Sequence, residues 1–338
     1  MNRPQWKQLL RQLPPPPSAA AATALPPVIR SPFSFDRTVF PFSPNIQSKP
    51  LSCKAQAFDD SDEHYYCRKS LKYWDKFYQR HQNKFFKDRH YLGKDWGKYF
   101  CGDDDDDDGV SADGKVLLEV GFGAGNTIFP LIAAYPMLFI HACDFSTEAL
   151  NLVKSNSNFD VKRMNVFTCD VTNEELCDRI LPSSVDLVTL IFMLSAVSPK
   201  KMPFVLQNVK KILKVVTIGS CFHIHFPLLF WHSFSSCEIM CGSFSQPNGH
   251  VLVKDYGVGD SAQVKLENRN QMISHNFYFR GDGTCSFYFS EDFLSNLFTE
   301  AGFCIVDMDT CCRQVVNHSR NMTFDRRWIR AIFKKIDS

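Results

Sequence analysis

The chain has 338 residues, of which 44% are hydrophobic, so it is long enough to bury one sizeable core and to carry appendages. Its formal net charge is only +2, so overall charge gives no reason to expect nucleic-acid binding, and only local basic patches need to be considered. Thirteen cysteines are scattered without a Cys-x-x-Cys pair. This pattern predicts no metal site and no disulfide framework, and it favours free thiols in a reducing compartment.

The first 58 residues differ in composition from the rest of the chain. They hold seven Lys or Arg and a single acid, together with four consecutive prolines and a run of alanines. This composition is typical of a transit peptide, and it lacks the compact apolar stretch of a secretory signal. We therefore expect residues 1–58 to direct the protein to a plastid or a mitochondrion. The alternative is a disordered tail without an address, on a cytoplasmic protein.

Residues 59–110 are predicted to form a helical lid followed by an acidic loop. Between His64 and Phe100 there are ten Lys or Arg and three acids, interleaved with aromatic residues; we call residues 64–100 the N-terminal basic patch. Five residues lie at helical spacing: Leu71, Trp74, Phe77, Tyr78 and His81. A helix that packs on the core and a lid whose basic face meets phosphates are compatible interpretations. The run Asp103–Asp108 is predicted to be a solvated loop without chemistry.

Residues 111–214 and 247–338 show the alternation of strands and helices that predicts a doubly wound α/β sheet. One helix is expected to begin at Ser198 and Pro199, and a second to run from Ser290 to Gly302. Apolar runs predict strands at 116–120, 139–143, 164–169, 185–192, 250–256, 303–310 and 327–333.

The block 215–246 interrupts this alternation. It opens with 23 residues that include no Lys, Arg, Asp or Glu, which is long enough for a membrane span, but it also carries three histidines and a proline. Removing the block joins Lys214 to Pro247 and gives a helix, a Pro-Asn-Gly turn and a buried strand. Its first residue is a valine, whose codons begin with GT, and its last is a glutamine, for which CAG is one codon. We interpret the block as a retained in-frame intron, with a surface loop or a membrane span as alternatives, and expect no stable membrane insertion.

A glycine-rich turn follows the first predicted strand, in the stretch Glu119-Val120-Gly121-Phe122-Gly123-Ala124-Gly125. Glycines there let the backbone turn sharply beneath a ligand. The second strand ends at Asp144, which is placed to hold the ribose hydroxyls of a nucleotide-like cofactor. The spacing G-x-G-x-G differs from the dinucleotide pattern G-x-G-x-x-G. Together with Glu119 and Asp170, this spacing favours S-adenosylmethionine over NAD.

The cofactor-binding residues can be assigned by position. Gly121, Gly123 and Gly125 are expected to bring backbone N–H groups to the methionine moiety, and Asp144 to accept from the ribose. Asp170 and Val171 would meet the adenine amine, and Ile191 would line the adenine or methionine pocket.

Several motifs resemble those of the tRNA N3-methylcytidine methyltransferases of the methyltransferase-like group. The likeness covers about residues 64–214 and 247–335, and its motifs are Trp74–Tyr78, Phe85–His90, Leu118–Gly121, Cys143–Ser146, Leu190–Ala196 and Asn276–Thr284. The resemblance implies a class I methyltransferase, Rossmann-like doubly wound sheet with one antiparallel strand, and Trp74 and Tyr78 closing over the cofactor. It also implies that the substrate is a cytidine of the tRNA anticodon loop, at the position conventionally numbered 32.

The implied reaction needs alignment and tolerance of positive charge rather than a base, because neutral cytosine already has a lone pair at N3. We expect Asp88 to face the developing charge and Arg89 to pair with a phosphate or with the cofactor carboxylate. The residues expected to bind RNA are Lys87, Arg280, Arg326 and Arg327. The last two belong to residues 311–335, the C-terminal basic patch, which holds seven Lys or Arg and one acid.

Two other functions remain open from the sequence. One is a small-molecule or protein methyltransferase with the same core, and the other is an inactive partner protein that binds S-adenosylmethionine. Binding that weakens steeply with salt would favour tRNA over a small neutral substrate. A tRNA synthetase or another helper protein is a candidate partner.

Overall fold

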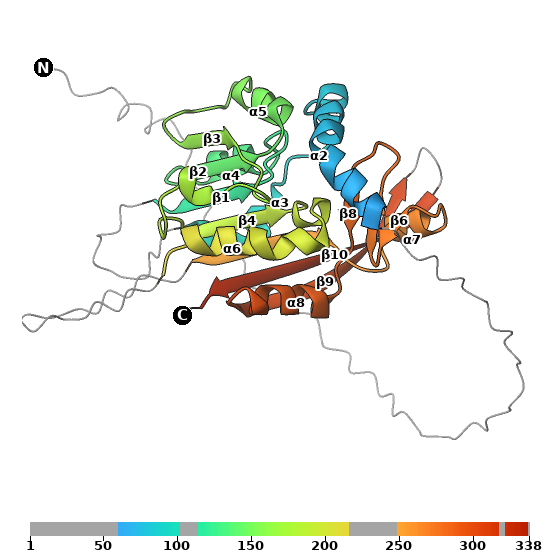
Figure 1. Cartoon of the computed structure of the whole chain (residues 1–338). Coiled ribbons are helices and arrows are strands. Elements are labelled where there is room, and N and C mark those ends of the chain that lie inside the picture. Colours follow the sequence, from blue (N-terminus) through green and yellow to red (C-terminus); the bar gives the residue numbers. More distant parts are fainter. Residues whose placement is uncertain (1–59, 102–113, 216–248, 318–321, 337–338) are drawn as a thin grey trace, which may run out of the picture. The chain divides into compact units, whose positions relative to one another are not determined.

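The computed structural model describes residues 60–101, 114–215, 249–317 and 322–336 (Figure 1). The chain divides into two units, Met1–Ala55 and Gln56–Ser338, and all described residues belong to the second. The expectations for residues 1–58, for the acidic run Asp103–Asp108 and for nearly all of the block 215–246 lie outside the described residues.

The core is a seven-stranded sheet in the order β3-β2-β1-β4-β5-β10-β9. Neighbouring strands from β3 to β5 are parallel, whereas β10 is antiparallel to both β5 and β9. This confirms the predicted α/β doubly wound sheet with one antiparallel strand. The strand bounds are β1 Val116–Val120, β2 Phe139–Asp144, β3 Met164–Thr168, β4 Leu187–Ile191, β5 His250–Tyr256, β9 Phe303–Asn317 and β10 Met322–Lys335.

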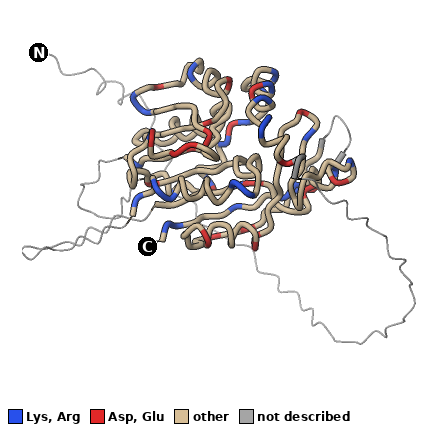
Figure 2. The backbone as a smooth tube through the Cα atoms, in the orientation of Figure 1, with Lys and Arg blue, Asp and Glu red and all other residues tan. Residues whose placement is uncertain are grey.

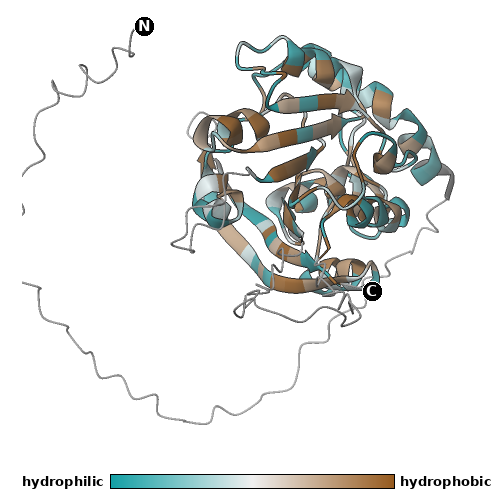
Figure 3. Ribbon diagram, turned by 90° about the vertical axis from the view of Figure 1, so that its left-hand side faces the viewer, coloured by the Kyte–Doolittle hydropathy of each residue, from teal (hydrophilic) through white to brown (hydrophobic). Residues whose placement is uncertain are grey.

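Helices cover both faces of this sheet and bury two apolar clusters. The helices are α2 Asp60–His81, α3 Tyr91–Phe100, α4 Ile128–Ala134, α5 Thr147–Lys154, α6 Met202–Ile212, α7 Ser261–Glu267 and α8 Glu291–Glu300. Because side chains alternate along a strand, Leu118 of β1 packs with α6 and α8 while its neighbour Leu117 packs with α3, α4 and α5. Figure 3 shows the hydrophobic colouring along the central strands that results from burial on both faces.

Both expected helices are present, but Ser198 does not cap the first one, because its hydroxyl donates to Glu63 instead. Pro199 opens a short 3₁₀ turn that leads into α6. The Ser290 hydroxyl accepts a hydrogen bond from the N–H of Phe293 at 3.2 Å and caps α8. α2 also contains the residues that were expected at helical spacing.

Two features of the fold differ from the expectation. A second sheet, of β6 Met272–Ser274, β7 Phe277–Phe279 and β8 Cys285–Phe287, was not predicted. Its strands have three residues each, too few to show a periodic pattern. The hairpin β9–β10 is also longer than expected, because its strands pair with each other beyond the end of β5.

Lys214 and Gly249, the described residues on either side of 215–248, are hydrogen-bonded to each other at the edge of the sheet opposite the glycine-rich turn. The C=O of Lys214 accepts a hydrogen bond from the N–H of Gly249 at 3.1 Å. If residues 215–246 were absent, this would be the closing bond of a four-residue turn Lys214-Pro247-Asn248-Gly249, with proline in its favoured second position. In the part of the chain that the structure describes, no helix is both long and apolar enough to cross a membrane.

Deleting residues 215–246 should therefore leave the fold intact and raise its melting temperature. The deletion removes an apolar segment that is an aggregation liability when exposed, and it shortens the connection between α6 and β5. Thermal denaturation and methyl transfer should show a higher midpoint and activity at least equal to that of the full chain. Deleting 215–248 is the matched control and should be less stable, because it leaves no residues for the turn. A loss of activity on deletion of residues 215–246 would show that the block is needed for function.

Candidate active site

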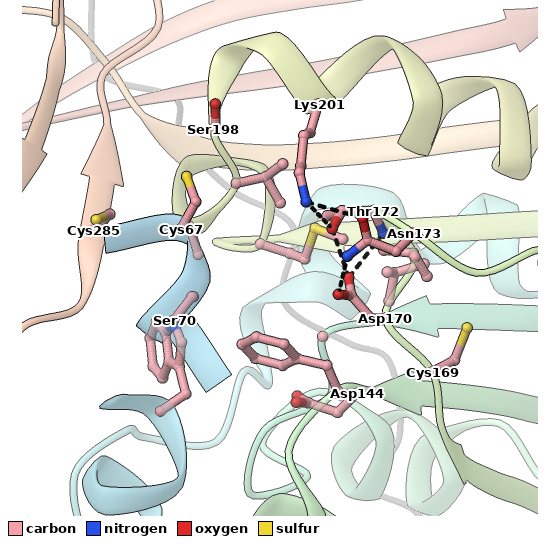
Figure 4. A pocket seen from close by; sticks show the side chains of 18 of the residues that line it. Cys67, Ser70, Asp144, Cys169, Asp170, Thr172, Asn173, Ser198, Lys201 and Cys285 are labelled. Atoms are coloured by element: carbon pink, nitrogen blue, oxygen red, sulfur yellow. Dashed lines mark hydrogen bonds between the residues drawn. The ribbon is translucent and has the colours of Figure 1, made fainter. Parts of the chain in front are cut away.

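Two adjoining cavities lie beneath α2. The larger one lies at the carboxyl ends of β1, β2 and β4, where ligands bind in open α/β sheets (Figure 4). Asp144, Asp170 and Val171 line it, as expected for cofactor-binding residues. Trp74 and Tyr78 reach it from α2, with their rings stacked at 5.8 Å between centroids. The structure therefore brings together residues from three separate parts of the sequence.

The glycine-rich turn makes room for a ligand but does not offer its N–H groups. Gly121, Gly123 and Gly125 have φ angles of +73°, +56° and +87°, which favour glycine. A Cβ at Gly121 would lie 2.7 Å from the side chain of Met193, in the wall of the cavity. All three N–H groups donate within the protein, to the C=O of Cys143, the carboxylate of Asp144 and the C=O of Phe122. These N–H groups are therefore already paired within the protein, and their contact with the methionine moiety stays a prediction.

Asp144 is buried, with 5% exposure. Its carboxylate accepts hydrogen bonds from the N–H groups of Gly123 and Ser146, both at 2.9 Å. Burial raises its pKa to about 6, although these two bonds oppose the shift. Each carboxylate oxygen has a further lone pair, so Asp144 can accept from hydroxyl groups while it also holds the glycine-rich turn in place.

Asp170 organises the loop after β3. One of its carboxylate oxygens accepts from the N–H and the hydroxyl of Thr172, and the other accepts from the amide of Asn173. Lys201 bonds to both of these partners at the rim of the cavity (Figure 4). Ile191 is buried at the end of β4 and lines the smaller cavity instead.

The smaller cavity adjoins the larger one and shares part of its wall. Trp74, Tyr78, Gly121 and Phe192 line both cavities. Phe192 has a positive φ of +56°, which is uncommon for a bulky residue and concentrates at functional sites. The remaining wall includes Phe86, Arg89, Asn126, Ser195, Tyr256 and Arg280. Sequence reasoning missed Phe192, Ser195 and Tyr256, although the first two lie in the motif Leu190–Ala196.

The segment after α2 is hydrogen-bonded to the glycine-rich turn. Asn126 donates through its side-chain amide to the C=O of Phe86 and to the carboxylate of Asp88, and its own C=O accepts from the N–H of Arg89 at 2.9 Å. The Arg89 guanidinium bonds to Thr127 and faces the smaller cavity. Asp88 and Lys87 are exposed and lie outside the linings of both cavities. Of the two expected catalytic residues, the structure therefore places only Arg89 at the site.

The expected RNA-binding arginines have different surroundings. Arg280 lies 5.5 Å from the ring centroid of Tyr256, in the smaller cavity, and Arg326 lies 6.0 Å from the same ring. Arg326 is also paired with the fully buried carboxylate of Asp260 at 2.8 Å. Arg327, the next residue of β10, points to the opposite face of the hairpin and is exposed.

Fewer side chains of the C-terminal basic patch are available to RNA than its seven Lys and Arg suggest. Lys335 is buried and donates to the C=O of Leu213, and Arg330 is within 4 Å of Asp95 and Asp309. Figure 2 shows that Lys and Arg are spread over many elements of the described chain. Among the described residues of the patch, Arg313 of β9 and Arg327 of β10 are exposed.

A methyltransferase domain model matches residues 118–215. The chain is 35% identical over 268 residues to the tRNA N(3)-cytidine methyltransferase METTL6 of Homo sapiens, covering 79% of this chain and 81% of that protein. It is 32% identical over 276 residues to the tRNA N(3)-methylcytidine methyltransferase trm141 of Schizosaccharomyces pombe, covering 80% and 94%. The chain belongs to the tRNA N(3)-cytidine methyltransferase family. A solved SAM-dependent methyltransferase from Anabaena variabilis is similar with a TM-score of 0.49 at 12% identity, covering 79% of this chain and 93% of that one.

Like its family, the protein is an S-adenosylmethionine-dependent methyltransferase, and its buried Glu119 fits that cofactor. Glu119 lies at the end of β1 with no exposed surface, bonded to Thr189 and 3.6 Å from the Arg89 guanidinium. Its oxygen Oε1 has no hydrogen-bond partner within the described protein. This oxygen faces the Arg89 guanidinium at ion-pair but not hydrogen-bond distance, so it can still accept a hydrogen bond from a donor such as the amine of the cofactor, although Glu119 itself lines neither cavity. Among the described residues, no cluster of His, Cys, Asp and Glu could hold a metal ion.

Replacing Asp144 with Asn should weaken S-adenosylmethionine binding by about tenfold or more, because a charged acceptor contributes more than a neutral one. Isothermal titration calorimetry measures the loss. Asp186→Asn is the matched control, since this carboxylate also accepts from a backbone N–H, that of Val116, but at the opposite edge of the sheet. Equal affinities in the two variants would show that the cofactor does not use Asp144.

Glu119 should make the protein less stable as the pH rises from about 4.5 to about 7. Burial raises the pKa of Glu119 from 4.5 to about 7, against the opposing influence of Arg89. The folded state therefore binds more protons than the unfolded state between these values, so the free energy of unfolding falls as the pH rises, with a limiting slope of about 1.4 kcal/mol per pH unit. Urea denaturation between pH 5 and pH 8 should give a shallower decline for Glu119→Gln. Parallel curves would contradict this prediction.

Proposed function

We propose that the protein transfers a methyl group from S-adenosylmethionine to N3 of a cytidine in the anticodon loop of tRNA, at position 32. The observation that carries the proposal is the family relationship, since the relatives are named for N3 of cytidine in tRNA. Two adjoining cavities with a shared aromatic wall support it, because a cofactor and a base must meet at one point.

The proposed reaction is a direct displacement. When bound, the cofactor supplies an electrophilic methyl group; the N3 lone pair forms the new C–N bond while the electrons of the S–C bond return to sulfur. The positive charge thus moves to the base, and no proton has to be removed. The protein needs only to align the reactants and to accept a cation, for which the faces of Trp74, Tyr78 and Phe192 are suitable.

Asp88 and Arg89 take different parts in this proposal. Arg89 lies in the smaller cavity beside Glu119 and can pair with a phosphate or with the cofactor carboxylate. Asp88 acts indirectly, because its carboxylate is bonded to Asn126 and holds the glycine-rich turn.

Positive side chains around the smaller cavity would hold the RNA backbone. Arg280 and Arg326 lie 5.5 Å and 6.0 Å from the centroid of the Tyr256 ring, and the exposed Lys87 and Arg327 would contact more distant parts of the RNA. Bases of an anticodon loop are partly unstacked, so moving one into the cavity costs little. Residues 59–110 would contribute the lid and its acidic loop. A tRNA synthetase or another helper protein is a further proposed partner.

We also propose that residues 1–58 direct the protein to a plastid or a mitochondrion. The sequence composition supports this, and fusion of this segment to a fluorescent protein tests it. Fluorescence confined to the cytoplasm would favour the alternative of a tail without an address.

Radiolabelled methyl transfer to total tRNA, followed by nucleoside mass spectrometry, tests the proposed reaction. The expected product is 3-methylcytidine, lost when position 32 is changed from cytidine to uridine in a transcript. Methylation of proteins or small molecules with no labelled tRNA would favour the second candidate. Cofactor binding without any transfer would favour an inactive partner.

Arg327→Ala should weaken tRNA binding and reduce the slope of log affinity against log salt by about one, as expected for the loss of one phosphate contact. Arg326→Ala should in addition lower the free energy of unfolding by about 1–3 kcal/mol, because the buried Asp260 loses its partner. Filter binding at several salt concentrations and urea denaturation measure the two effects. Lys162→Ala, an exposed charge at the opposite edge of the sheet, is the control and should change neither. An unchanged salt slope for Arg327→Ala would remove Arg327 from the RNA surface.

A further inference from the structure

A serine and a buried aspartate form a connected pair in the wall of the smaller cavity. Ser195 lies in the 3₁₀ turn Leu194–Ala196 after β4, is 2% exposed and lines this cavity. Asp255 lies beneath it in β5 and is fully buried. The Asp255 carboxylate accepts from the N–H groups of Ser195 and Tyr256, both at 2.9 Å, and it is also hydrogen-bonded to the Ser195 hydroxyl.

This arrangement fixes the direction of the serine hydroxyl. An ionised carboxylate can only accept hydrogen bonds, so the Ser195 hydroxyl must donate its hydrogen to Asp255. Burial raises the pKa of Asp255 to about 6, while the bonds from Ser195 and Tyr256 and the charge of Arg280 oppose that rise. The carboxyl group is therefore mostly ionised at neutral pH. The lone pairs of the Ser195 oxygen remain available to a donor that enters the cavity.

We propose that Ser195, oriented by Asp255, accepts a hydrogen bond from the exocyclic amine of the target cytosine and so distinguishes cytosine from uracil. This inference rests on the proposed function. In cytosine the amine is adjacent to N3, whereas uracil has a carbonyl oxygen at that place. A hydroxyl that can only accept attracts the amine and repels the carbonyl. Ser195 is thus a specificity-determining residue, and Asp255 is a positioning residue.

The two arginines of the smaller cavity cannot make this distinction. Arg280 and Arg89 are donors without acceptor capacity, and they suit the carbonyl O2 that cytosine and uracil share. The Asn126 amide already donates to the C=O of Phe86 and to Asp88. Among the described side chains that line this cavity, Ser195 is the one whose hydroxyl is held as an acceptor by a buried carboxylate.

The test compares two anticodon stem-loops that differ by one amine. One carries cytidine at the target position, and the other carries pyrimidin-2-one ribonucleoside, which keeps N3 and O2 but lacks the amine. The ratio of kcat/KM for the two RNAs is measured with the full-length protein, with Ser195→Ala and with Ser195→Thr. Intrinsic differences in the reactivity of N3 cancel when the ratios are compared between protein variants.

The preference for cytidine should fall by about fivefold or more in Ser195→Ala, the expected loss for one buried hydrogen bond. Ser195→Thr keeps the hydroxyl and should keep the preference. Asp255→Asn should also lose it, because an amide that donates to Ser195 turns the hydroxyl hydrogen toward the cavity. Ser286→Ala, a buried serine of β8 outside both cavity linings, is the matched control and should behave as wild type.

A folded variant that is too slow to assay can be compared by its dissociation constants for the two RNAs, measured with S-adenosylhomocysteine present, and the same change in ratio is expected. An unchanged ratio in Ser195→Ala, with an active wild-type protein, would overturn the inference and leave the proposed function standing. A wild-type protein that methylates neither RNA nor tRNA would overturn the proposed function, and the inference with it.

Discussion

The active site depends on a carboxyl group buried at the end of β1. Glu119 has no exposed surface, and its carboxylate lies 3.6 Å from the guanidinium of Arg89, which comes from the segment after α2. A buried carboxylate is costly unless it is paired and hydrogen-bonded, so the fold has to bring Arg89 to this point. The bonds that join Asn126 to Phe86, Asp88 and Arg89 do so.

The position of Arg89 against the glycine-rich turn connects the walls of the two cavities. Arg89 belongs to the wall of the smaller cavity, whereas the glycine-rich turn that it touches borders both. α2 is held above them by hydrogen bonds from Ser146 to Asp75 and from Ser198 to Glu63. A cofactor in one cavity and a base in the other would therefore meet beneath a helix that is held at two points, which favours the alignment that a displacement between two bound molecules requires.

The sheet and the position of the cofactor site could be predicted from the sequence, because long apolar runs and a glycine-rich turn are local signals. The hydrogen-bond and ion-pair partners of the polar side chains could not be predicted from the sequence. Counting charges does not reveal that Lys335 is buried against a carbonyl or that Arg326 is paired with Asp260. Asp88 was predicted to face the positive charge on the reacting base because it is a carboxylate. Its actual partner, Asn126, lies 38 positions further along the chain. Asp255 was missed because its role depends on contact with Ser195, which comes from another strand end.

Hydrogen–deuterium exchange on the Asn126→Ala variant tests most directly whether the hydrogen bonds of Asn126 couple the segment after α2 to the glycine-rich turn. If it does, exchange should accelerate together in residues 86–92 and in residues 121–127, and binding of S-adenosylmethionine should no longer protect both segments. Faster exchange confined to residues 86–92, with cofactor protection of the glycine-rich turn unchanged, would contradict the account.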